Sequence, residues 1–114
     1  MKKLSVLALL VMTFALQYCS STKKVAKVEE PKLTYAANIQ PLMVANCSPC
    51  HFPPQGNKKA YNSYLAVKTD IDSILNRIQR HPGERGFMPF RKARLSDSTI
   101  NVFVQWKKDG LLEN

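Results

Sequence analysis

Cys47-Ser48-Pro49-Cys50-His51 is the stretch around which this 114-residue chain is interpreted. Its pattern, C-x-x-C-H, is typical of covalent haem attachment. Two thiols three positions apart lie on neighbouring faces of a helical turn, where both reach the vinyl groups along one side of a porphyrin. His51 follows at once, so its imidazole lies under the ring as the proximal iron ligand. The stretch therefore predicts one covalent haem c, attached through Cys47 and Cys50 and ligated by His51.

Two other kinds of site use a C-x-x-C pair. A zinc site needs two more ligands at similar spacing, and the sequence contains no second cysteine pair. A thioredoxin-like redox pair belongs in a βαβ pattern, and the flanking residues show none. Chance is the remaining explanation, and the haem interpretation is favoured over it.

Over roughly residues 33–112 the chain resembles a small monohaem class I cytochrome c. This resemblance implies an all-α fold in which about four short helices wrap one haem. It also implies that the N- and C-terminal helices cross, with Phe103 and Ile39 or Leu42 near the crossing. The matching pieces are Asn38-Ile39-Gln40-Pro41-Leu42, the C-x-x-C-H motif, Ser63-Tyr64-Leu65-Ala66-Val67-Lys68, Met88-Pro89, Trp106 and Gly110.

Residues 81–95 contain the predicted distal ligand. Met88 stands between two aromatic residues and is followed by Pro89, so its loop is stiff. In the resembled family a loop of this kind supplies the distal sulfur, and Met88 is predicted to do so here. Met43 lies one turn before Cys47 and is expected in the core. His81 is the rival ligand, expected instead at the surface or against a propionate, and His/His ligation would lower the potential.

The N-terminus is predicted to direct export. Lys2 and Lys3 precede an apolar run, residues 4–16, which is short for a membrane span and suits a signal peptide. A leucine three positions before Cys19 resembles a bacterial lipoprotein cleavage site, although Tyr18 stands where a small residue is usual. We expect a signal peptide over 1–18, lipid on Cys19, a flexible tether over 19–32 and a haem domain over 33–114. A plain secretory signal and an uncleaved anchor are the alternatives.

The chain is basic, with 17 Lys and Arg residues against 8 Asp and Glu, a formal net charge of +9. Removal of residues 1–18 takes away Lys2 and Lys3, which leaves 15 minus 8, or +7. A basic surface favours acidic redox partners. No nucleic-acid-binding motif is present, so nucleic acid is not an expected partner.

Four helices are expected, and no alternating run long enough for a strand is present. Their predicted caps are polar residues that accept backbone hydrogen bonds, and Gly110 is predicted at the C′ position of the last helix. The expected caps and apolar stripes are Asn38 with Ile39, Leu42 and Met43; a start near Asn62 with Tyr61, Tyr64, Leu65 and Val67; Asp70 with Ile71, Ile74, Leu75 and Ile78; and Ser96 with Ile100, Phe103, Val104 and Trp106.

These predictions favour a one-electron carrier, because both axial positions would be filled by side chains. The carrier is expected to be exported across the cytoplasmic membrane to the periplasmic side and anchored there by its lipid. Trp106 is expected either to donate to a haem propionate or simply to pack. The alternatives are a subunit of a haem enzyme with an open distal site and a ligand sensor in which Met88 is displaced.

Overall fold

The computed structural model describes residues 30–114, and residues 31–114 form one compact unit. The predictions for the signal peptide, for Cys19 and for most of the tether lie outside the described residues. Within 30–114 the chain is helical, with one isolated bridge between Thr34 and Leu112 and no strand, so the all-α prediction is confirmed. None of these helices is long and apolar enough to cross a bilayer. The elements are a π-helical turn η1 (Tyr35–Ile39) and the α-helices α2 (Gln40–Cys47), α3 (Tyr64–Thr69), α4 (Ile71–Ile78) and α5 (Asp97–Lys108).

The first helix begins earlier than predicted. Thr34, not Asn38, is the cap, and its hydroxyl accepts a hydrogen bond from the backbone N–H of Ala37 at 3.4 Å. Asn38 reaches back instead, and its side-chain oxygen accepts from the N–H of Thr34 at 2.9 Å. The two side chains therefore satisfy two backbone N–H groups at the start of the helix, much as a capping box does, and η1 continues directly into α2.

The middle helices match the predicted pattern with two corrections. α3 begins at Tyr64, capped by Ser63, and Leu65 on this helix is 68% exposed, so its place in an inward stripe was wrong. Asp70 stands at the N-cap position of α4, but its carboxylate makes no capping hydrogen bond. The predicted α4 stripe is confirmed, because Ile71, Ile74, Leu75 and Ile78 are all buried.

The last helix begins and ends as predicted. The Ser96 hydroxyl accepts from the N–H of Thr99 at 3.2 Å. At the other end Gly110 has a φ of +98°, and the N–H of Leu111 donates to the Trp106 carbonyl at 3.0 Å. This six-to-one bond together with the left-handed glycine is a Schellman ending, which satisfies carbonyls that the helix leaves open.

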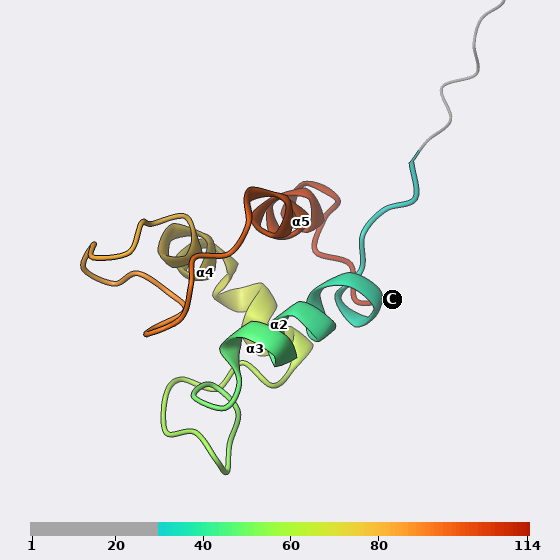
Figure 1. The fold of residues 1–114 in the computed structure, drawn as a ribbon. Coiled ribbons are helices and arrows are strands. Elements are labelled where there is room, and N and C mark those ends of the chain that lie inside the picture. Colours follow the sequence, from blue (N-terminus) through green and yellow to red (C-terminus); the bar gives the residue numbers. More distant parts are fainter. Residues whose placement is uncertain (1–29) are drawn as a thin grey trace, which may run out of the picture. The chain divides into compact units, whose positions relative to one another are not determined.

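The two ends of residues 31–114 are tied together. Tyr35 donates its N–H to the Leu112 carbonyl at 2.8 Å, and the Tyr35 and Trp106 rings lie 6.1 Å apart. Trp106 is fully buried, and its indole N–H donates to the Leu112 carbonyl at 2.8 Å. Trp106 therefore has the packing role. Figure 1 shows the C-terminus beside the first helical turns. The core consists of Tyr35, Ile39, Met43, Tyr61, Val67, Ile71, Ile74, Leu75, Ile78, Ile100, Phe103 and Trp106.

Two long loops extend from the helices. One follows α2 over residues 48–63, and the other joins α4 to α5 over residues 79–96 (Figure 1). The first contains most of the C-x-x-C-H stretch and the second contains Met88. Lys92 links the two, because its ammonium donates to the carbonyl of Ser48 at 3.2 Å.

Candidate functional site

A cavity of about 510 Å³, here called the central cavity, lies among the helices and both long loops. Its size falls within the range of about 300–1,000 Å³ that is usual for small-molecule and cofactor sites. Some of the side chains that line it also belong to the hydrophobic core, so the cavity borders the core directly. Its lining comprises Met43, Asn46, Cys47, Ser48, Cys50, His51, Lys58, Lys59, Tyr61, Asp70, Ser73, Ile74, Arg77, Ile78, Met88, Pro89, Phe90, Lys92, Leu95 and Phe103.

Both motif cysteines line the central cavity as free thiols. Cys47 is the last residue of α2 and is half-buried, with its Sγ 3.8 Å from the Sδ of Met43. Burial raises the pKa of the Cys47 thiol to about 11, an effect that the nearby Lys92 charge opposes. Cys50 lies beyond the helix end and is exposed. Met43 is fully buried, which confirms its predicted place in the core.

The imidazole of His51 is held in one tautomer. Its Nδ1 lies 2.7 Å from the carbonyl oxygen of Lys59. A carbonyl oxygen only accepts, so Nδ1 carries the proton and the neutral ring keeps its free lone pair on Nε2. Ligating histidines in metal sites commonly donate their other N–H to a backbone carbonyl in this way. His51 therefore has the protonation pattern of a ligand.

A polar chain lies beside His51 in the cavity wall. The Tyr61 ring stacks on the imidazole, with centroids 4.8 Å apart, and its hydroxyl donates to the Asp70 carboxylate. Lys59 pairs with the same carboxylate at 2.8 Å. The hydrogen bonds from Lys59 and Tyr61 lower the Asp70 pKa, whereas burial and the Asp70 contact raise the Tyr61 pKa.

Met88 lines the central cavity from the second loop and is half-buried against the core. Its backbone N–H donates to the Arg77 carbonyl on α4 at 3.2 Å. Two residues before Met88, the Gly86 carbonyl accepts a hydrogen bond from the guanidinium of the same Arg77 at 3.5 Å. The position of Met88 thus depends on the last turn of α4.

The structure separates the two candidate distal ligands. Met88 lines the central cavity together with Cys47, Cys50 and His51. His81 is exposed and is not among the residues that line it, and its backbone N–H is bound to the Glu84 carboxylate.

Several residues that build the site were not singled out from the sequence. A Cβ at Gly56 would lie 2.2 Å from the carbonyl oxygens of Pro49 and Cys50, so the first loop folds back on the motif where only glycine fits. Lys92, a cation on the second loop, also donates to the Asn46 carbonyl at 3.4 Å near the end of α2. The two prolines shortly before Gly56 mark a turn there, whereas no local pattern marks Lys92.

The residues that line the central cavity include all four that the sequence predicts to attach a haem or to bind its iron. They offer two thiols, an imidazole with a free Nε2, a thioether and apolar walls. Within residues 30–114 no three His, Cys, Asp or Glu side chains gather as a metal site. A haem iron needs only two side-chain ligands, because its porphyrin supplies the others.

No family model, curated protein or solved structure matches the chain.

Proposed function

We propose that this protein is a one-electron carrier, a class I cytochrome c with one covalent haem. One observation carries the proposal: the C-x-x-C-H motif and Met88, two patterns recognised separately in the sequence, line one cavity. The contact of η1 with α5 supports the crossing of first and last helices that this fold requires.

The bound haem would supply an iron couple that alternates between the ferric and ferrous states. The residues of this chain then have separate tasks. Cys47 and Cys50 would hold the ring, and His51 would offer Nε2 to the iron because the Lys59 carbonyl occupies its other nitrogen. Met88, which lines the same cavity, would supply a thioether, a ligand that favours a high potential. If His51 and Met88 both bind the iron, no coordination position would remain for a substrate.

Export is part of the proposal because it agrees with the chemistry of haem attachment, and anchoring rests on the lipidation predicted for Cys19. Haem is joined to C-x-x-C-H motifs outside the cytoplasm, so the predicted signal peptide and the predicted cofactor agree. Lipid on Cys19 would place the domain on the periplasmic side of a membrane. With two thiols joined to haem and the third lipidated, each of the three cysteines in the chain has a role.

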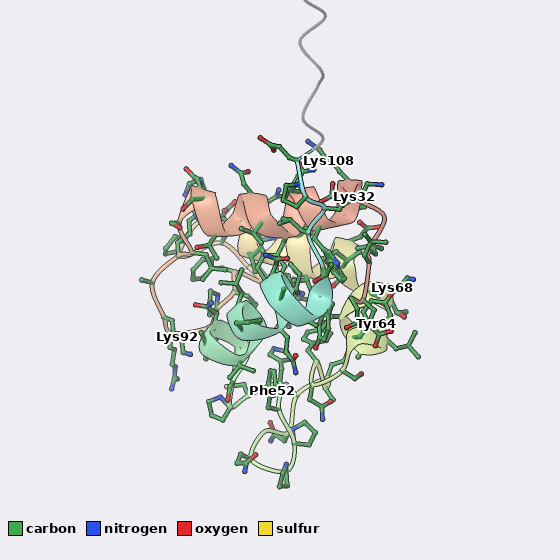
Figure 2. The ribbon with its side chains drawn as sticks, turned by 90° about the vertical axis from the view of Figure 1, so that its right-hand side faces the viewer. Lys32, Phe52, Tyr64, Lys68, Lys92 and Lys108 are labelled. Atoms are coloured by element: carbon green, nitrogen blue, oxygen red, sulfur yellow. The ribbon has the colours of Figure 1, made fainter. Side chains whose placement is uncertain are left out.

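Acidic redox proteins are the proposed partners. Three lysines, Lys58, Lys59 and Lys92, line the central cavity, against one acid, Asp70. Figure 2 shows labelled lysines on several sides of the domain, with Lys92 and Lys68 on opposite sides. The positive field would therefore speed encounter with an acidic protein, while the cavity lysines would favour docking there.

Absorption spectroscopy tests the proposal. The full chain is expressed in a bacterium that makes c-type cytochromes, and mass spectrometry determines haem and lipid. We expect a low-spin spectrum with a sulfur-to-iron charge-transfer band, and haem that resists acid–acetone extraction. A high-spin ferric spectrum would favour a haem enzyme, and rapid carbon monoxide binding to the reduced protein would favour a sensor. Colourless protein would overturn the proposal.

A further inference from the structure

Tyr61 and Asp70 line the same cavity as His51, and the proposed function gives them no task. The Tyr61 ring lies nearly parallel to the imidazole, at 21°, and its backbone N–H donates to the His51 carbonyl at 2.9 Å. Tyr61 is 8% exposed, so packing fixes its own ring. A single hydrogen bond at Nδ1 would let the imidazole tilt and turn about that bond. The stacked ring of Tyr61 removes this freedom.

The Asp70 carboxylate does not cap the helix that it precedes. At the N-cap position of a helix an aspartate ordinarily stabilises the helix by accepting a backbone hydrogen bond. Asp70 makes no such bond. It accepts from the Tyr61 hydroxyl instead and pairs with Lys59, with only 19% of its side chain exposed. Both contacts of the Asp70 carboxylate are therefore with residues that line the central cavity.

Lys59 closes the set of contacts. Its carbonyl accepts the Nδ1 proton of His51, and its ammonium holds Asp70. The chain of contacts runs from the imidazole to Lys59, on to Asp70 and Tyr61, and back to the imidazole through the stacked rings. This circuit restrains both the rotation and the tilt of the imidazole, and none of its contacts involves Met88.

We propose that Tyr61 and Asp70 are positioning residues that fix the plane of the His51 imidazole and set the charge beside it. This inference rests on the proposed function, because it assigns His51 to the iron. Groups that contact a metal ligand without touching the metal orient the ligand and tune its basicity. The plane of an axial imidazole also determines how the d orbitals of a low-spin ferric iron split.

The test uses full-length protein with bound haem and three variants, Tyr61→Leu, Tyr61→Phe and Asp70→Asn. Tyr61→Leu removes the stacked ring, whereas Tyr61→Phe keeps the ring and removes only the hydroxyl. Electron paramagnetic resonance should show shifted or broadened g values in Tyr61→Leu and wild-type g values in Tyr61→Phe, whose ring is held in place by packing. The potential of Asp70→Asn should rise, because the Lys59 charge then stands uncompensated in the cavity wall and disfavours ferric iron. Asp70→Glu should recover the wild-type potential.

Asp72→Asn is the matched control. It removes the same charge from the same helix, but Asp72 pairs with Lys107 at 2.5 Å, is 78% exposed and does not line the central cavity. Solvent and salt screen such a site. The g values of this control should match wild type, and its potential should shift less than that of Asp70→Asn.

The outcomes separate the inference from the proposed function. Wild-type g values in Tyr61→Leu, with equal potentials in Asp70→Asn and Asp72→Asn, overturn the inference alone. A wild-type protein without haem overturns both. If one of Tyr61→Leu and Asp70→Asn does not accumulate, the other decides, through the g values of Tyr61→Leu or through the potential of Asp70→Asn against that of Asp72→Asn.

Discussion

The backbone N–H of Met88 donates a hydrogen bond to the carbonyl of Arg77, 3.2 Å away on α4. This bond fixes the loop at the residue that is predicted to ligate the iron. Before Met88 the loop is also held by Arg77 of this helix and by Arg80 just after it, since Arg77 donates to the Gly86 carbonyl and Arg80 to the Arg85 carbonyl. A weak thioether bond benefits from such a support, because the sulfur is already in place before it binds.

Replacement of Met88 by alanine should open the distal face. The sulfur-to-iron charge-transfer band should disappear, the potential should fall, and carbon monoxide should bind the reduced protein rapidly. The matched control is His81→Ala, since His81 is exposed and outside the central cavity. An unchanged low-spin spectrum in Met88→Ala, together with a lost one in His81→Ala, would reverse the assignment of the distal ligand.

A methyl group at Gly56 should disrupt the first loop. The added Cβ would lie 2.2 Å from two backbone oxygens of the motif, neither of which can move aside as a flexible side chain does. We expect Gly56→Ala to cost about 3 kcal/mol or more of unfolding free energy, measured by denaturant titration.

Gly83→Ala is the control for this substitution. Gly83 has a φ of +95° and open space around it, so the cost should be only the left-handed penalty of about 1–2 kcal/mol. Equal costs at the two glycines would show that the loop relaxes away from the motif.

The sequence predicts helices where apolar spacing and caps agree, as at α5 with Ser96 and Gly110. It misplaced the first start, because both Thr34 and Asn38 are good cap residues and the choice depends on the π-helical turn between them. It also placed Leu65 inward from spacing alone, although a helix as short as α3 shows too little of the period to define a face.

The candidate site shows a similar division. C-x-x-C-H and Met-Pro are local patterns, so they were found without a structure. The Lys59–Asp70–Tyr61 contacts join residues up to 11 positions apart across a loop and a helix start, and Asp70 had a sufficient local explanation as a cap. Lys92 contacts residues 44 and 46 positions away. Such contacts depend on the fold, and no local pattern predicts them.

Acid should destabilise the wild-type protein partly through Asp70. Hydrogen bonds from Lys59 and Tyr61 hold the Asp70 pKa below its ordinary 3.8 in the folded state. Between these two pKa values the unfolded chain binds more protons, so stability rises with pH there and is fully present above about pH 5. On acidification from pH 6 to pH 2.5, the unfolding free energy should therefore fall less steeply for Asp70→Asn than for wild type. Asp72→Asn, which keeps the Asp70 contacts, should follow the wild-type curve, and parallel curves for all three proteins would contradict the prediction.

Protein without haem should not fold cooperatively. The central cavity is walled by core residues of three helices, among them Met43 on α2, Ile74 on α4 and Phe103 on α5. Without the cofactor these side chains would face a space of about 510 Å³, large for a domain of this size, which has little other core to offset the loss. The double variant Cys47→Ala with Cys50→Ala should therefore lose its sharp thermal transition.

Trp106 reports the difference, because it is the only tryptophan and is fully buried. In the haem-bound wild type its fluorescence should be quenched by the nearby porphyrin and recover in one step on unfolding. In the haem-free double variant the emission should already be that of a solvent-exposed indole at 25 °C. A cooperative melt of that variant, with blue-shifted Trp106 emission below the transition, would show that the helices hold one another without the haem and that the core does not depend on the group proposed to fill it.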